Sequence, residues 1–179
     1  EVLESSAAAE YGSDAIGGVV HVLTHTLRFS EQNNIRPEAA FKWMSGGMET
    51  SGQGALTASG RRWAVRAGGA YRHFGDLVAG KGLGKESPNG YTQWSAEAKG
   101  LFQLSRRFTL TAAYQDLEQQ DVPVFHKVQL ENFALNEFDP QRRMLSYLKT
   151  DWQIGHRLLQ SAALTLARQH TREGRISQK

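Results

Sequence analysis

Apolar and polar residues alternate along several stretches of this chain, and the clearest alternation covers residues 62–72. The odd positions are apolar or small, namely Trp63, Val65, Ala67, Gly69 and Tyr71. Three of the even positions carry a positive charge, namely Arg62, Arg66 and Arg72. A period of two is typical of a β-strand, whose successive side chains point to opposite faces. Residues 62–72 are therefore predicted to form a strand with one apolar and one charged face.

The three arginines restrict what the charged face can contact. In a dry core each guanidinium would be an unpaired buried cation, which is strongly unfavourable. The charged face must therefore meet water, either as bulk solvent or inside a hydrated barrel. At about 3.3 Å per residue and a tilt near 45°, the stretch from Trp63 to Tyr71 climbs roughly 19 Å. This height is close to that of the apolar band between the aromatic girdles of outer-membrane barrels.

Other stretches with a period of two are also predicted to be strands. They cover residues 38–46, 51–59, 93–104, 108–115, 144–154 and 161–169. Aromatic residues recur near the ends of their apolar faces, namely Trp94, Phe102, Phe108, Tyr114 and Trp152. A core stripe and a membrane girdle would both give this pattern, and the alternation with charged residues favours the girdle. The predicted fold class is mainly β, an antiparallel meander.

Short and long connections alternate between these strands. Turns at residues 59–61, 105–107 and 155–157 alternate with long segments at 75–89 and 116–143. Outer-membrane barrels have tight periplasmic turns and large outer loops. About seven strands leave two open sheet edges, whereas plugged transporters close at about 22 strands. Residues 38–179 are therefore predicted to be an incomplete part of a large transmembrane β-barrel, and residues 27–37 a linker before it.

Composition narrows the class of protein without identifying it. Of the 179 residues, 40% are hydrophobic and 22% are charged, and the formal net charge is +3. No apolar run approaches the 18 or so residues that a membrane helix needs, whereas a mean hydropathy of −0.49 is compatible with alternating barrel strands. There is no cysteine, so disulfides, thiolate metal sites and a cysteine nucleophile are excluded. The scattered arginine pairs do not suggest a nucleic-acid surface.

The first 24 residues differ in kind from the rest. Val2 and Leu3 read as a short strand, and the apolar run from Val19 to Leu23 reads as another. Between them lies a glycine-bearing turn that permits close backbone approach, made of Tyr11, Gly12, Ser13, Asp14, Ala15, Ile16, Gly17 and Gly18.

This stretch resembles the C-terminal end of the plug domain of TonB-dependent outer-membrane receptors. The matching residues, in order, are Val2, Leu3, Tyr11, Gly12, Ser13, Ala15, Ile16, Gly17, Gly18, Val19 and Val20. Glu4, Ser5 and Ser6 stand where the family usually has Arg-Gly-Pro. The resemblance implies that residues 1–26 are the last element of a plug and that residues 38–179 are the N-terminal portion of the barrel. It also implies that the chain is an internal fragment of the receptor.

The same resemblance implies a function. Receptors of this family lie in the outer membrane of Gram-negative bacteria and bind a scarce nutrient, typically an iron-siderophore, haem or cobalamin. The TonB-ExbB-ExbD complex drives import through a segment that would lie upstream of Glu1. Asp14 to Gly18 and the segments 75–89 and 116–143 would then contribute to gating and ligand capture. Outer-membrane lipid would be a further partner.

Few residues suggest chemistry of their own. Phe125 and His126 lie in the longest predicted loop and could contact an iron chelate or haem, although an ordinary loop histidine is the more common case. The histidines lack metal-ligand spacing, the carboxylates are dispersed, and Ser13 lacks the frame of a nucleophile elbow. We therefore expect no enzyme, no cofactor and no resident metal.

Two other classes fit parts of the pattern. A passive porin or adhesin would share the strands and lack a plug, and a soluble β-rich ligand binder would share only the alternation. The key prediction is that Trp63 and Arg66 lie on opposite sides of one sheet.

Overall fold

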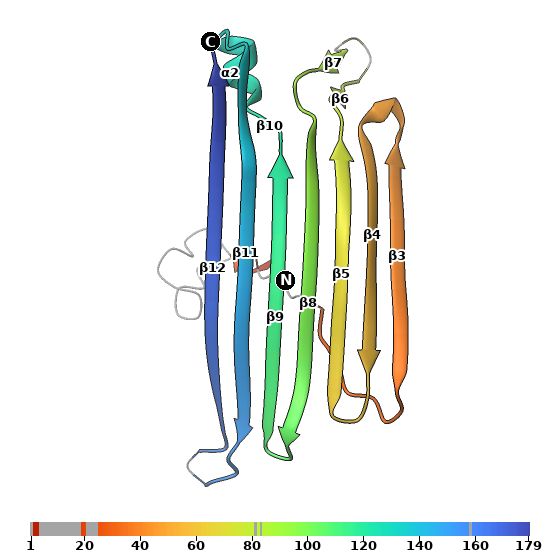
Figure 1. Cartoon of the computed structure of the whole chain (residues 1–179), viewed down its shortest axis with the longest axis vertical. Helices are drawn as coiled ribbons and strands as arrows, with labels where there is room; N and C mark the ends of the chain where they lie inside the picture. The colour runs from red at the N-terminus through yellow and green to blue at the C-terminus, as the bar shows by residue number, and fades with distance from the viewer. Residues whose placement is uncertain (1, 4–18, 21–24, 81, 83, 158) are drawn as a thin grey trace.

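One antiparallel sheet dominates the structure, a computed structural model that describes residues 2–3, 19–20, 25–80, 82, 84–157 and 159–179 (Figure 1). Its eight strands are β3 (Asn34–Met44), β4 (Glu49–Ser59), β5 (Trp63–Phe74), β8 (Tyr91–Ser105), β9 (Phe108–Gln120), β10 (Val122–Pro123), β11 (Leu135–Gln153) and β12 (Ser161–Gln178). Each long strand pairs with the next long strand along the chain, and β10 pairs with the upper part of β11. The predicted antiparallel, mainly β fold is confirmed.

Smaller elements connect or precede these strands. β1 (Val2–Leu3) pairs with β2 (Val19–Val20); a strand was predicted at each place, but their pairing was not. β6 (Leu77–Val78) and β7 (Lys85–Glu86) form a two-stranded hairpin between β5 and β8. The 3-10 turn η1 (Ser45–Gly47) connects β3 to β4, and the helix α2 (Phe125–Leu130) lies between β10 and β11. Gly46 and Gly47 in η1 have φ values of 73° and 71°, which glycine adopts without strain.

The two ends of the sheet are unlike. In Figure 1 the elements η1, β6, β7, β10 and α2 lie at the upper end, here called the loop end. The lower end, here called the turn end, holds the connections 60–62, 106–107 and 154–160. The predicted separation of longer and shorter connections is therefore present, with the short η1 as an exception at the loop end.

Cross-strand pairing assigns the residues to two faces. Trp63 is opposite Phe102, whereas Arg66 is opposite Lys99 and flanked on the other side by Thr57. The face that carries Trp63 is called the apolar face, and the face that carries Arg66 is called the polar face. Trp63 and Arg66 thus lie on opposite sides of the sheet, as predicted.

Three predicted boundaries were wrong. β3 begins at Asn34, inside the stretch predicted to be a linker up to residue 37. The predicted loop 116–143 contains the end of β9, β10, α2 and the first part of β11. The last predicted strand was given an end at residue 169, whereas β12 continues to Gln178. In each case polar residues hid the strand, because the alternation used for the prediction requires one apolar face.

None of the helices in the described part of the chain is long and apolar enough to span a membrane.

Candidate functional site on the polar face

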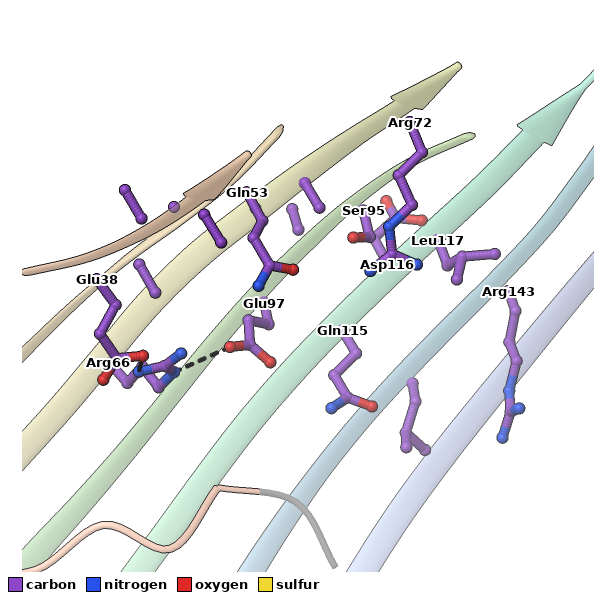
Figure 2. A pocket seen from close by; sticks show the side chains of 18 residues that line it. Glu38, Gln53, Arg66, Arg72, Ser95, Glu97, Gln115, Asp116, Leu117 and Arg143 are labelled. Atoms are coloured by element: carbon purple, nitrogen blue, oxygen red, sulfur yellow. Dashed lines mark hydrogen bonds and ion pairs between the residues drawn. The ribbon is translucent and has the colours of Figure 1, made fainter. Parts of the chain in front are cut away.

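A hollow of about 770 Å³ lies along the polar face (Figure 2). Its walls come from β3, β4, β5, β8, β9 and β11. Most of the lining side chains that reach into it are polar or charged, among them Glu38, Gln53, Arg66, Arg72, Glu97 and Arg143. Such a lining suits water and polar solutes, and it does not suit a dry core.

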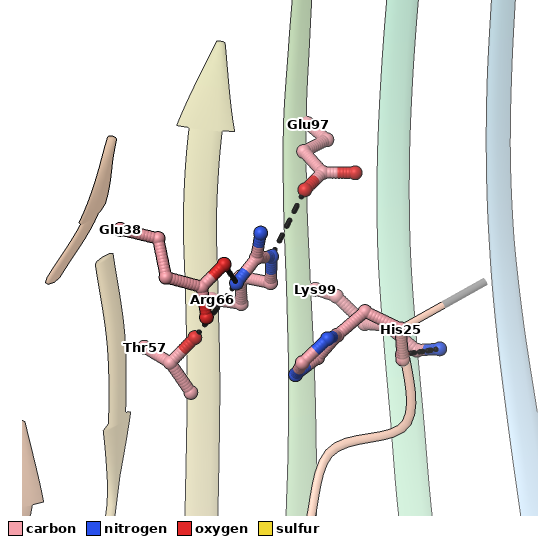
Figure 3. A network of polar contacts seen from close by, with 6 residues as sticks. All are labelled: His25, Glu38, Thr57, Arg66, Glu97 and Lys99. Atoms are coloured by element: carbon pink, nitrogen blue, oxygen red, sulfur yellow. Dashed lines mark hydrogen bonds and ion pairs between the residues drawn. The ribbon is translucent and has the colours of Figure 1, made fainter. Parts of the chain in front are cut away.

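Arg66 forms the central polar network of this face (Figure 3). Its Nη1 donates to Glu38 Oε2 at 2.9 Å and to Thr57 Oγ1 at 3.1 Å, and its Nε donates to Glu97 Oε1 at 3.0 Å. The Arg66 side chain is only 13% exposed, whereas the two carboxylate side chains are 51% and 44% exposed. The cation is therefore held between two partly hydrated acids from strands on either side of it.

Further polar pairs extend the network toward the loop end. Lys42 forms an ion pair with Glu49, which also accepts a hydrogen bond from Ser51 Oγ at 2.7 Å. Gln119 Nε2 donates to Gln93 Oε1 at 2.9 Å across β8 and β9. The polar face is thus connected laterally from β3 to β9.

The segment of residues 25–33 crosses the polar face before it enters β3. Lys99 Nζ donates to the backbone carbonyl oxygen of His25 at 2.9 Å (Figure 3). Leu27 is 6% exposed, one of the lowest values among the described apolar residues. At the turn end, Ser30 N donates to Gly60 O at 3.0 Å and Arg61 Nε donates to Glu31 O at 3.0 Å. The chain therefore covers part of this face and leaves it at the turn end.

The apolar face is exposed and bordered by aromatic residues. Phe41, Trp43, Tyr71 and Trp152 are 73%, 65%, 57% and 51% exposed. Toward the loop end the border consists of Trp43 on β3, Tyr71 on β5, Trp94 on β8 and Tyr114 on β9. Toward the turn end Trp63 is opposite Phe102, and Phe108 is opposite Trp152. Large exposed apolar areas of this kind mark a surface that contacts something other than water.

The border at the loop end is slanted relative to the strand pairing. Through β4, Trp43 is level with His73, whereas through Ala98, Tyr114 is level with Ala67. The border therefore descends by six residues of β5 (73 minus 67) over the four steps from β3 to β9. At about 3.3 Å per residue and 4.8 Å between strands, this slope corresponds to an angle of roughly 45°. A horizontal boundary crossing tilted barrel strands would give such a slope.

Beyond this border the apolar face becomes charged. Arg142 donates to both carboxylate oxygens of Asp116, from Nε at 3.0 Å and from Nη2 at 2.6 Å. Its guanidinium also lies 3.6 Å from Glu118 Oε2 and 5.6 Å from the centroid of the Trp94 ring. Among the described residues, Asp116 is one of two buried charged residues, at 5% exposure. No sequence pattern indicated this pair, because Arg142 was assigned to a loop.

The two larger connections touch each other at the loop end. Gln129 Nε2 of α2 donates to Ser87 O at 2.6 Å. Asp76 Oδ1 accepts hydrogen bonds from Asn89 N at 2.8 Å and Gly90 N at 3.1 Å, which closes the base of the loop between β5 and β8. These contacts, led by the Asn89 amide and the Ser87 hydroxyl, hold the pKa of the Asp76 carboxyl well below its usual range.

The predicted ligand residues Phe125 and His126 are the first two residues of α2 and not part of an irregular loop. Phe125 is 37% exposed, and His126 is exposed as well. Both lie at the loop end, well away from the hollow and its lining. Within the described ranges no group of three histidine or acidic side chains could hold a metal ion.

The glycine-bearing motif from Tyr11 to Gly18 lies outside the described residues. Arg66 and its face were predicted from the sequence, whereas the acids Glu38 and Glu97 that hold it were not. Strand parity could have found them, since both occupy the face opposite the aromatic residues.

Comparisons of this chain with protein-family models, with curated proteins and with solved structures found no match.

Proposed function

We propose that this chain is part of an outer-membrane receptor for TonB-dependent uptake of a scarce nutrient. The observation that carries the proposal is the pairing of an exposed apolar face, bordered by a slanted line of aromatic residues, with a charged face that the preceding segment crosses. Lipid would cover the first face, and a hydrated, obstructed pore would lie behind the second.

The composition of the apolar face supports lipid contact. Between Trp63 and Tyr71 on β5, and at the levels opposite on β8, its side chains are uncharged: Val65, Ala67, Gly69, Ala96, Ala98 and Gly100. Charged substituents are costly at such positions in a bilayer, whereas a protein surface in water normally carries them. This difference favours a membrane barrel over the soluble ligand binder.

The path of residues 25–33 supports an obstructed pore. A plug that lies inside a barrel must connect to the first strand along the inner wall. Here the contacts of His25, Ser30 and Glu31 follow the polar face down to the turn end, which is the periplasmic end in outer-membrane barrels. The residues before 27 would thus belong to the plug, and the glycine-bearing motif of residues 11–18 to its last turn.

The loop end would be the ligand entrance. The contact between Gln129 and Ser87 joins the connections on either side of β8 and β9, and Phe125 and His126 lie in the same region. The proposed nutrients are iron-siderophores, haem or cobalamin, and the energy would come from the TonB-ExbB-ExbD complex. No enzymatic step is proposed.

Uptake by a deletion strain tests the function. We expect the strain to lose growth on one member of a panel of iron chelates, haem and cobalamin when that nutrient is scarce. Complementation should restore growth in a strain with TonB and fail in a strain without it. Uptake that does not depend on TonB would identify a passive porin instead.

A chemical tether tests whether residues 25–33 must move. The chain has no cysteine, so the pair H25C/K99C can be joined selectively by a short, reducible bis-thiol reagent. We expect the tether to abolish uptake and reduction to restore it, since it fixes the segment to the wall.

The matched control is Q93C/Q119C, which joins two residues that already face each other across β8 and β9. This tether should leave uptake unchanged. Equal uptake in both tethered variants would contradict a moving plug.

A further inference from the structure

Two arginines on the C-terminal strand follow directly after the apolar face. Arg168 and Arg172 share the side of β12 that carries Leu164 and Leu166, and His170 lies between them. Residues two apart on a strand are about 6.6–6.8 Å apart and point to the same side. The arginines therefore form a column of positive charge that continues the apolar column toward the loop end.

This column begins at the level where the apolar face ends. Leu166 is opposite Leu148, which is opposite Ala112, and Ala112 lies two residues toward the turn end from Tyr114. Tyr114 is the border residue on β9, and the border descends from β3 toward β9. On β12 it is therefore expected at Leu166, and Arg168 is the first residue beyond it.

The charge of this column is not balanced by the described residues. Arg168 is opposite Ser146, and Arg172 is opposite Arg142. Arg142 already binds Asp116 through two hydrogen bonds. The side chains of Arg168 and Arg172 make no hydrogen bond or ion pair to any described residue. Two like charges directly opposite each other on a sheet are unfavourable unless an anion lies near them.

We propose that Arg168 and Arg172 bind the phosphate group of an anionic membrane lipid. Guanidinium groups match the geometry of phosphate oxygens, and arginines just outside the hydrocarbon region meet lipid headgroups at their own depth. The inference rests on the membrane placement in the proposed function and goes beyond it, since nutrient uptake itself requires no lipid site.

Native mass spectrometry of the full-length receptor in non-ionic detergent tests the site, with dioleoyl phosphatidic acid as the probe. One arginine near an anionic surface contributes about five-fold in affinity, so R168Q/R172Q should bind the tightest lipid roughly 30-fold more weakly. The control R36Q/R72Q removes two arginines from the polar face, which lipid would not reach, and should bind that lipid like the wild type. Dioleoyl phosphatidylcholine should show little difference among the three proteins.

The outcomes separate this inference from the proposed function. If the receptor resists urea extraction from membranes and supports uptake while R168Q/R172Q binds phosphatidic acid as tightly as the wild type, the lipid site is overturned alone. Inorganic phosphate that competes fully with the lipid at equal concentration would also overturn it, because the site would then recognise a free anion. If the receptor is not in the membrane fraction, the proposed function fails and the lipid site fails with it.

Discussion

The two faces of the sheet are made by the same strands and treat charge in opposite ways. On the polar face, Arg66 lies between Glu38 and Glu97, whose side chains are about half exposed. On the apolar face, charge is confined to the region beyond the aromatic border, where Arg142 binds Asp116, which is 5% exposed. The polar face can therefore exchange one partner for water, whereas the apolar face carries no charge inside its aromatic border. The proposed surroundings, lipid on one side and water on the other, would account for this difference.

The largest effect is expected when the same positive charge is placed on each face in turn. Ala98 on the apolar face lies between Ala67 and Tyr114, whereas Ala55 on the polar face lies between Gly68 and Glu38. We expect A98R to lower the free energy of unfolding by about 2–4 kcal/mol in lipid vesicles, because an arginine near the middle of the hydrocarbon loses its hydration. A55R should change it little, since the new guanidinium meets water and Glu38.

Urea-induced unfolding followed by tryptophan fluorescence measures both variants. If A98R and A55R lower the unfolding midpoint equally, the two faces have the same surroundings, and the membrane placement would be wrong.

The second test removes one arginine from each face. R142Q should lower the free energy of unfolding by about 1–3 kcal/mol, because it leaves the buried Asp116 carboxylate without its cation. R66Q should cost less, about 0–1 kcal/mol, because Glu38 and Glu97 are exposed enough to be rehydrated. Equilibrium unfolding of the two variants gives the order.

The double variant R142Q/D116N provides the control for this test. Removing both charges should recover part of the loss seen in R142Q alone. A larger loss in R66Q than in R142Q would reverse the comparison and show that the polar face is the drier one.

The smallest effect is expected at the loop end, outside both faces. The lowered pKa of Asp76 means that its contribution to stability is complete above the ordinary carboxyl value of 3.8 and is lost as the pH falls below that value. Hydrogen exchange at the Asn89 amide should therefore become faster below about pH 4 than its intrinsic pH dependence explains. D76N should remove this extra acceleration.

Because Asp76 lies outside both faces, its hydrogen-exchange profile serves as a reference for the two tests on the faces. Its hydrogen bonds lie in a connection, so detergent micelles and bilayers should give the same pH profile. A pH profile that differs between micelles and bilayers would place this loop in contact with lipid. Lipid would then not be limited to the apolar face.

Much of the sheet was predictable because one face is apolar. Alternation located β4, β5, β8 and most of β9, and it placed Trp63 and Arg66 on opposite sides. It failed wherever both faces are polar, as in β12 after residue 169 and in β11 before Met144. In those stretches the strand is stabilised by its backbone pairing and by residues on the neighbouring strand. A local sequence pattern shows neither of these.

The candidate site was less predictable than the sheet. The sequence indicated a wet face around Arg66, but the acids that hold it are 28 and 31 residues away along the chain. The contact between Lys99 and His25 spans 74 residues and joins a side chain to a backbone carbonyl. Such partners depend on the register of several strands, which turn residues and alternation do not fix to within one residue.

The unequal strand lengths have a consequence for how a receptor of this kind would be approached from outside. β3 ends at Met44, one residue beyond Trp43, whereas β12 continues for twelve residues beyond Leu166 (178 minus 166). Tilted by about 45°, those residues rise roughly 28 Å. The rim would then stand far higher above the bilayer at β11 and β12 than at β3. Large molecules such as antibodies would contact the higher part of the rim first, while small solutes could diffuse in over the lower part.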